Sequence, residues 1–168
     1  MAVLAGVIGT TLPFLLFNYA APKLTTKQTA LTLNIIPVVA TVPTVRFVGG
    51  SATVLEGNVS HTIKMSIQPH LMAAGSVTIT AAPGAGFVLG TDATTTPALS
   101  GTTLTLPVAA MADTISFAVN ILDDSNIEGN ENLVFTLTSA STSLTIGSPS
   151  TYTFTIADND VFIPSYTI

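Results

Sequence analysis

The stretch from Thr114 to Leu137, T-I-S-F-A-V-N-I-L-D-D-S-N-I-E-G-N-E-N-L-V-F-T-L, decides the fold of this chain. Apolar side chains occupy every second position on both sides of an acidic centre. A period of two is typical of a β-strand that buries one face. The alternating apolar positions are Ile115, Phe117, Val119 and Ile121 before the acidic centre and Leu133, Phe135 and Leu137 after it.

The same alternation recurs along the chain from Val45 onward, with Gly, Pro, Asn or Ser between the runs. Loops are expected at 83–86 and 147–150, and no stretch has helical periodicity. Short alternating runs at this spacing predict an all-β chain folded as an antiparallel β-sandwich. The other inward positions are Ile63, Met65, Ile67, Val77, Ile79, Leu104, Leu106, Tyr152, Phe154 and Ile156.

Composition excludes several classes of protein. Of 168 residues, 48% are hydrophobic and 8% are charged, which is incompatible with a disordered chain. Four Lys and Arg cannot form a nucleic-acid-binding patch. Cysteine is absent, so neither disulfides nor thiolate metal sites exist. A surface rich in Thr and Ser and poor in charge favours an extracellular or assembled protein at the cell surface.

Residues 1–22 carry no charge. They are long enough to cross a bilayer as a helix, yet they lack the basic start and A-x-A site of a cleaved signal peptide. A retained apolar segment requires burial, which predicts either contact between subunits of a homo-oligomer or contact with a membrane. The candidate assembly residues are Val3, Leu4, Val7, Ile8, Leu12, Phe14, Leu15, Leu16 and Phe17.

Residues 23–44 have a different character and predict one strand followed by an extended linker. Leu31, Leu33 and Ile35 alternate with polar residues before Pro37 and Pro43. This strand could be donated to a neighbouring subunit, or it could pair within its own domain. The chain therefore divides into an assembly or anchor segment at 1–22, a strand and linker at 23–44, and a sandwich at 45–168.

The acidic residues are concentrated in two loops. All nine lie beyond Val45, where Arg46 and Lys64 are the accompanying Lys and Arg residues, and six of them directly follow alternating strands. If those strands end at the same end of the sandwich, the carboxylates converge and either take up protons or bind a cation. Oxygen ligands without His or Cys select a hard ion, and irregular loops suit Ca²⁺ better than Mg²⁺.

The segment 45–160 resembles the Calx-beta domain, a module of sodium/calcium exchangers, an integrin subunit and bacterial surface proteins. The matching elements are V-R-F-V at Val45, V-L-E-G at Glu56, G-T-D-A at Asp92, D-D-x-x-x-E-x-x-E from Asp123, and I-A-D-N-D from Ile156. The resemblance covers about two thirds of the chain. It implies an immunoglobulin-like sandwich with calcium bound by acids at one end.

Carried over residue by residue, the resemblance implies a calcium ligand set in which Asn159 replaces an acid of the family pattern and Ala93 replaces its usual Tyr. A lower ligand charge implies weaker binding, although the Asn159 carbonyl remains a possible ligand. The implied ligands are Glu56, Asp92, Asp123, Asp124, Glu128, Glu131, Asp158, Asn159 and Asp160.

Catalysis has no supporting residues. His61 and His70 lack an acid or nucleophile at motif spacing and are interpreted as surface histidines, and no phosphate-binding or zinc-protease motif occurs. The sequence therefore predicts no enzyme and no small-molecule substrate. It favours a structural subunit of an extracellular filament or surface homopolymer with a calcium-stabilised sandwich. The alternative is a calcium-binding adhesion module anchored to a membrane by residues 1–22.

Overall fold

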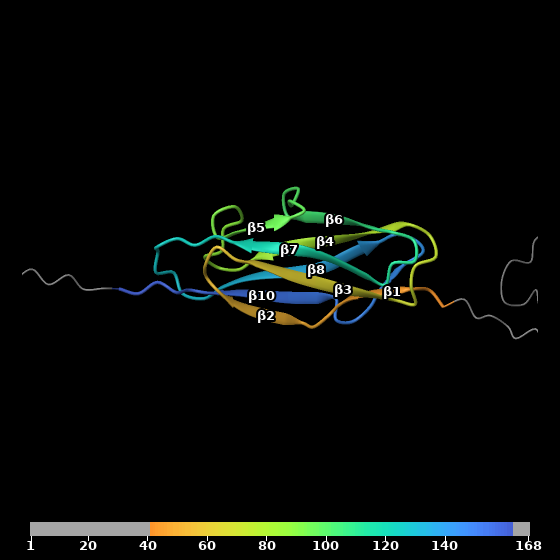
Figure 1. Ribbon diagram of the computed structural model, residues 1–168, viewed down its shortest axis with the longest axis horizontal. Helices are drawn as coiled ribbons and strands as arrows, with labels where there is room; N and C mark the ends of the chain where they lie inside the picture. Colours follow the sequence, from red (N-terminus) through yellow and green to blue (C-terminus); the bar gives the residue numbers. More distant parts are fainter. Residues whose placement is uncertain (1–40, 163–168) are drawn as a thin grey trace, which may run out of the picture. The chain divides into compact units, whose positions relative to one another are not determined.

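Two five-stranded sheets pack face to face in the computed structural model, which describes residues 41–162 (Figure 1). These residues contain ten strands and no helix, so none of them forms a helix that could cross a membrane. The all-β sandwich predicted from the alternating pattern is confirmed. The predicted assembly segment 1–22 and the predicted strand with Leu31, Leu33 and Ile35 lie outside the described residues.

The first sheet, sheet A, has the order β5-β7-β3-β1-β9. Its strands are β1 (Thr44–Phe47), β3 (Ser60–Gln68), β5 (Ala93–Thr96), β7 (Thr114–Ile121) and β9 (Thr145–Ile146). The second, sheet B, has the order β2-β10-β8-β4-β6. Its strands are β2 (Ser51–Leu55), β4 (Gly75–Pro83), β6 (Thr103–Val108), β8 (Glu131–Ala140) and β10 (Thr151–Ala157).

The core lies between the sheets and is built from the alternating apolar positions. Phe117 of sheet A meets Phe135 of sheet B edge to face, with ring centroids 4.9 Å apart. The predicted inward residues are buried except Ile115, which is half-buried near the start of β7. Leu71, Phe87 and Leu144 also join the core from loops, where no alternation marks them.

Most strand pairs of the sandwich are antiparallel, as predicted, and two pairs are parallel. The first stretch of the domain begins in sheet A as β1 and crosses at Gly49 into sheet B as β2. Each half then pairs in parallel with a late strand, β1 with β9 and β2 with β10. Gly49 adopts a φ of +91°, which glycine accepts without strain, so the chain can change sheets there.

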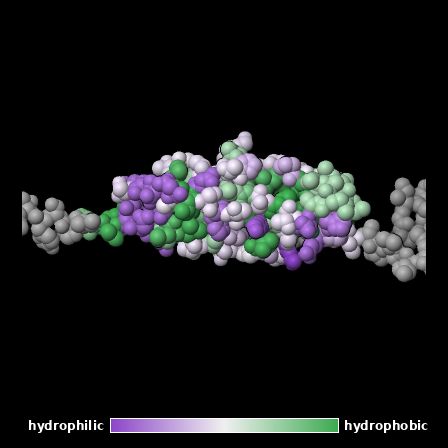
Figure 2. Space-filling model, viewed as in Figure 1, coloured by the Kyte–Doolittle hydropathy of each residue, from purple (hydrophilic) through white to green (hydrophobic). Residues whose placement is uncertain are grey.

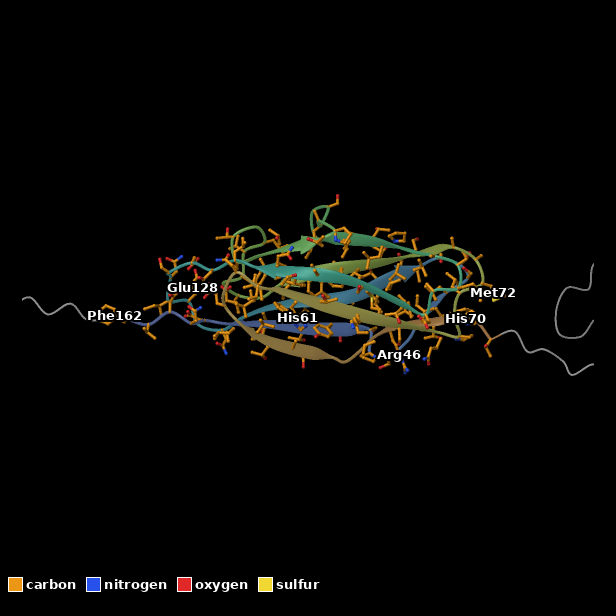
Figure 3. All side chains as sticks on the ribbon, in the orientation of Figure 1. Arg46, His61, His70, Met72, Glu128 and Phe162 are labelled. Atoms are coloured by element: carbon orange, nitrogen blue, oxygen red, sulfur yellow. The ribbon has the colours of Figure 1, made fainter. Side chains whose placement is uncertain are left out.

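His61 corrects the prediction of a surface histidine, because its side chain is half-buried. Its ring lies 5.4 Å from the Phe154 ring, and its Nε2 lies 3.4 Å from the Tyr152 hydroxyl. The β3 alternation places it on the same face as Ile63, at the inner side of sheet A. The side chain therefore fills space between the sheets, and Figure 3 shows it apart from Glu128.

One end of the sandwich collects the acidic segments. β2, β7 and β10 all finish at this end, β8 begins there, and the loop between β4 and β5 passes over it, at the left of Figure 1. The space-filling view shows the same end as a hydrophilic area (Figure 2). Asp113 lies at the other end of β7, where its carbonyl accepts a hydrogen bond from the Ile67 N–H at 2.8 Å.

Candidate metal centre

Four segments that are distant in sequence bring acidic side chains to the same end of the sandwich. Glu56 follows β2, and Asp92 precedes β5. The β7–β8 loop supplies three acids, and the segment after β10 supplies two more. The acids converge because the strands that carry them share this end, which the sequence analysis stated as the condition for a metal site.

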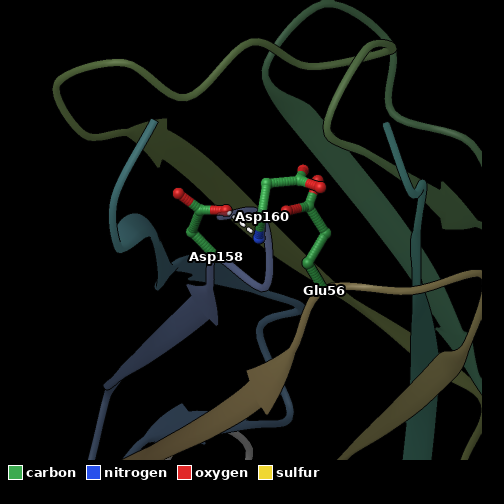
Figure 4. A group of neighbouring side chains, drawn as sticks. All are labelled: Glu56, Asp158 and Asp160. Atoms are coloured by element: carbon green, nitrogen blue, oxygen red, sulfur yellow. Dashed lines mark hydrogen bonds between the residues drawn. The ribbon is translucent and has the colours of Figure 1, made fainter. Parts of the chain in front are cut away.

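The first group consists of Glu56, Asp158 and Asp160 (Figure 4). One carboxylate oxygen from each lies within 4.8 Å of the others. Asp158 Oδ1 accepts the Asp160 N–H at 2.8 Å, which turns the chain back toward Glu56. Asp160 Oδ2 is buried and has no hydrogen-bond donor among the described residues.

The second group consists of Asp92, Glu128 and Glu131, again with one oxygen from each within 4.8 Å of the others. Asp92 and Glu131 are buried, with 8% and 6% of their surface exposed, whereas Glu128 is exposed. The Val88 N–H donates to Asp92 Oδ2 and holds that side chain in place. Glu131 Oε1 is buried with no donor among the described residues.

Asp158 joins the two groups. Its Oδ2 accepts the backbone N–H groups of Glu128 at 2.9 Å and Gly129 at 2.8 Å. The segment after β10 is therefore fixed to the β7–β8 loop by hydrogen bonds to one carboxylate. Glu128 belongs to the second group and Asp158 to the first. A displacement of either residue therefore directly affects the other group.

Asp123, Asp124 and Asn159 lie at the border of the groups. Asn159 Nδ2 donates to the Glu56 carbonyl at 2.8 Å and contacts Asp123 Oδ1 at 3.3 Å. Asp124 accepts the Asn126 N–H at 2.7 Å and so shapes its own loop. The amide of Asn159 thus places a hydrogen-bond donor among acids, where the family pattern has another carboxylate.

Burial and repulsion between carboxylates disfavour the charged form of the acidic side chains at this end of the molecule. Desolvation, followed by the neighbouring Asp92 charge, raises the pKa of Glu131 to about 7. Desolvation also raises the pKa of Glu56, Glu128 and Asp160, and nearby carboxylates add to each increase. Within residues 41–162, neither Lys nor Arg contributes to the charges that act on these acids. The group as a whole therefore favours uptake of a cation or of protons.

Asp158 behaves differently, because its pKa is lowered by the backbone N–H groups of Gly129 and Asp160. Hydrogen bonds to the charged form keep this carboxylate ionised. Asp158 therefore keeps its negative charge, whereas the neighbouring Glu56 and Asp160 carboxyls have raised pKa values.

The nine predicted ligands all lie at this end, and six of them form the two groups. Asp123, Asp124 and Asn159 lie beside the first group without belonging to it. The sequence analysis missed Gly129 and Gly86. Gly86 has a φ of +88°, and a Cβ there would lie 2.7 Å from Glu131 Oε1. The sequence marks Gly86 only as part of the loop expected at 83–86.

No known family model matches this sequence, and no curated protein matches it either. Solved structures do match. The apo-form Calx CBD1 domain is 21% identical, and the alignment covers 71% of this chain and all of that one with a TM-score of 0.60. The Calx CBD2 domain is 9% identical over 69% of this chain and 86% of its own, with a TM-score of 0.57.

A third structure, described as the calcium binding domain CBD12 of CALX1.1, is 22% identical with a TM-score of 0.59. The match covers 69% of this chain and only 44% of that one, so this chain spans less than half of it. These likenesses identify the class of the described domain: it has a Calx-beta-like fold of the immunoglobulin-like sandwich type. The resemblance read from the acidic motifs is thereby confirmed at the level of the fold.

Proposed function

We propose that this chain is a structural subunit of an extracellular filament or surface homopolymer whose β-sandwich is stabilised by Ca²⁺. The observation that carries the calcium part is the convergence of acids from four segments with two buried carboxylate oxygens that lack a donor among the described residues, Glu131 Oε1 and Asp160 Oδ2. A buried oxygen without a donor is costly unless an ion or water satisfies it.

The donor set fits Ca²⁺. Every side chain of the two groups offers oxygen, and Ca²⁺ accepts six to eight oxygens in irregular arrangements. Glu56, Asp158 and Asp160 would hold an ion in the first group, and Asp92, Glu128 and Glu131 would hold one in the second. A bound cation would supply positive charge where the described residues have none, so it would relieve repulsion and tie four segments together.

Calorimetric titration of the chelated protein with CaCl₂ and MgCl₂ tests this proposal. Calcium should bind and magnesium should bind far more weakly, because Mg²⁺ requires near-octahedral geometry that the loops do not provide. Heat of binding that is equal for the two ions, or absent for both, would contradict the calcium assignment. The likeness to a domain described as calcium binding supports the choice of ion.

The structural role rests on the sequence. Few charges and many outward Thr and Ser residues suit an extracellular assembly, and the uncharged residues 1–22 need a surface to bury them. The same segment also favours a second candidate, a calcium-binding adhesion module anchored to a membrane. Electron microscopy of the full chain in detergent-free buffer separates the two, since a homopolymer forms filaments and an anchored module requires detergent or lipid.

A further inference from the structure

β2 is an outer strand of sheet B, at the lower edge of the sandwich in Figure 1. The Thr153 N–H donates to the Gly50 carbonyl at 2.9 Å, and the Glu56 N–H donates to the Ala157 carbonyl at 2.8 Å. These bonds fix the parallel register with β10, so Ala52 and Val54 direct their backbone groups to β10. The N–H and C=O groups of the alternate residues 51, 53 and 55 consequently point away from the sheet.

Within residues 41–162 no strand lies beside this outer edge of β2. Ala52 and Val54 pack against the core, whereas the side chains of Ser51, Thr53 and Leu55 are exposed. Leu55 is an apolar side chain with 62% of its surface exposed. The edge therefore offers a row of free backbone groups together with an apolar contact, which is a template for another strand.

The edge of β6, the other outer strand of sheet B, is protected. Thr103 exchanges hydrogen bonds with Ser100, at 2.8 and 3.1 Å, on the side away from β4. Pro107 occupies the same side of the strand and has no N–H to offer. Only Thr105 remains between them, so β6 cannot extend the sheet.

The outer strands of sheet A are also poor templates. β9 has two residues, and β5 has four and is followed by Pro97. The Ala93 carbonyl of β5 already accepts the Gly90 N–H at 2.8 Å. Of the four outer strands in the described residues, β2 alone combines five residues with free backbone groups and contains neither proline nor charge.

We infer that β2 is the interaction surface for a second copy of this chain, which pairs antiparallel through its own β2. Centred on Thr53, this pairing sets Thr53 opposite Thr53 and Ser51 opposite Leu55, so every free backbone group of the edge gains a partner. It joins two copies of sheet B into one continuous sheet. The exposed Leu55 side chain is then covered by neighbours across the new strand pair.

Charge selects the antiparallel direction. The acidic cluster begins at Glu56, the residue after β2, so parallel strands would place two clusters side by side. Antiparallel strands send the clusters to opposite ends and set Glu56 opposite Gly50, which has no side chain. The outward positions of sheet B are uncharged, and the two cations of the described residues, Arg46 and Lys64, belong to strands of sheet A. No like charges meet across this pairing.

Single cysteines in the full chain test the pairing, because the natural sequence contains no cysteine. Residues that face each other across hydrogen-bonded antiparallel strands have Cα atoms about 5.5 Å apart, within the range of a disulfide. We expect Thr53→Cys to form a covalent dimer under mild oxidation. The matched control is Thr105→Cys, another exposed threonine in an outer strand of sheet B, and it should remain monomeric on a non-reducing gel.

The direction of pairing has its own test. Mixed Ser51→Cys and Leu55→Cys chains should cross-link to each other at least several-fold more than either chain cross-links to itself. Failure of Thr53→Cys to cross-link, or equal cross-linking of Thr105→Cys, would overturn the proposal, and so would dominant Ser51→Cys homodimers. If residues 31–35 of the same chain covered β2, Thr53→Cys would fail to cross-link. Calcium binding and filament formation are measured in separate experiments. A negative result in either one leaves the cross-linking result interpretable.

Discussion

Asp158 and Gly129 are 29 residues apart in sequence, yet Asp158 Oδ2 accepts the Gly129 N–H at 2.8 Å. This bond joins the residue after the last strand to the β7–β8 loop, which holds three of the acids. The loop is therefore shaped by the protein's own hydrogen bonds, and under the proposed function a cation would enter a cluster that is already assembled. Preorganisation of this kind reduces the ordering cost of binding.

Calcium should raise the melting temperature of the full chain. An ion that binds only the folded state adds about 2.7 kcal/mol at a hundredfold excess over Kd. Thermal unfolding in EGTA and in millimolar CaCl₂, followed by circular dichroism, measures the difference. Equal midpoints under the two conditions would mean that the acidic end is only a solvated surface.

Replacement of Asp124 or Asp123 by Ala should remove most of the calcium-dependent rise in melting temperature. Asp124 acts on the Glu56, Glu128 and Asp160 carboxylates, and Asp123 contacts Asn159. Asp113→Ala is the control, because Asp113 lies at the opposite end of β7. A similar loss in all three variants would indicate an effect of net charge and would contradict a local site.

Gly86→Ala should destabilise the domain more than Gly90→Ala and should weaken calcium binding. Both glycines have positive φ, so each substitution carries backbone strain of about 1 to 2 kcal/mol. Only at Gly86 would the new Cβ also meet Glu131 Oε1, at 2.7 Å, whereas nothing lies within 4 Å at Gly90. Urea unfolding and calcium titration of both variants measure the contrast, and equal behaviour would show that Glu131 tolerates displacement.

Without calcium, the free energy of unfolding should fall as pH rises from about 4.5 to about 7. The folded state holds a proton on Glu131, whose pKa is raised to about 7 from 4.5, while the unfolded chain has released it. The total change is a few kcal/mol at most, since one pKa unit is worth about 1.4 kcal/mol. The lowered pKa of Asp158 has the opposite sign and acts only below its ordinary value of 3.8.

Urea unfolding in EGTA at several pH values gives this slope, and Glu131→Gln should flatten it. Saturating calcium should also remove the slope, because the ion replaces the proton. A metal-free domain that becomes more stable between pH 4.5 and 7 would contradict the raised pKa of Glu131.

Removal of residues 1–40 should leave a folded, calcium-responsive domain that no longer forms filaments. The cut retains Pro43, whose carbonyl accepts the Thr145 N–H at 2.8 Å and so holds β9 in place. The core between the sheets is formed by residues within 41–162. Size-exclusion chromatography beside electron microscopy compares the intact and shortened chains, and filaments that persist after the cut would place the polymer contacts in the sandwich.

The sequence by itself determined most of the strand side chains that form the core, because a strand with one buried face must alternate, as Phe117 and Phe135 do. It also determined the chemistry of the candidate metal centre, since the loops offer oxygen ligands and contain neither His nor Cys. Periodicity records a single strand and its two faces. It carries no information about which strands become neighbours, so it predicted neither the crossing at Gly49 nor the parallel partners of β1 and β2.

Only the tertiary structure decided that the acids divide into two groups and that Asp158 connects them. Those relationships depend on where β2, β7, β8 and β10 end in space, which is fixed by pairing between residues up to 103 positions apart, such as Asn159 and Glu56. The half-buried His61 and the free edge of β2 have the same origin. A side chain's burial and a backbone group's partner are set by what the rest of the chain places beside them, and local sequence does not specify that.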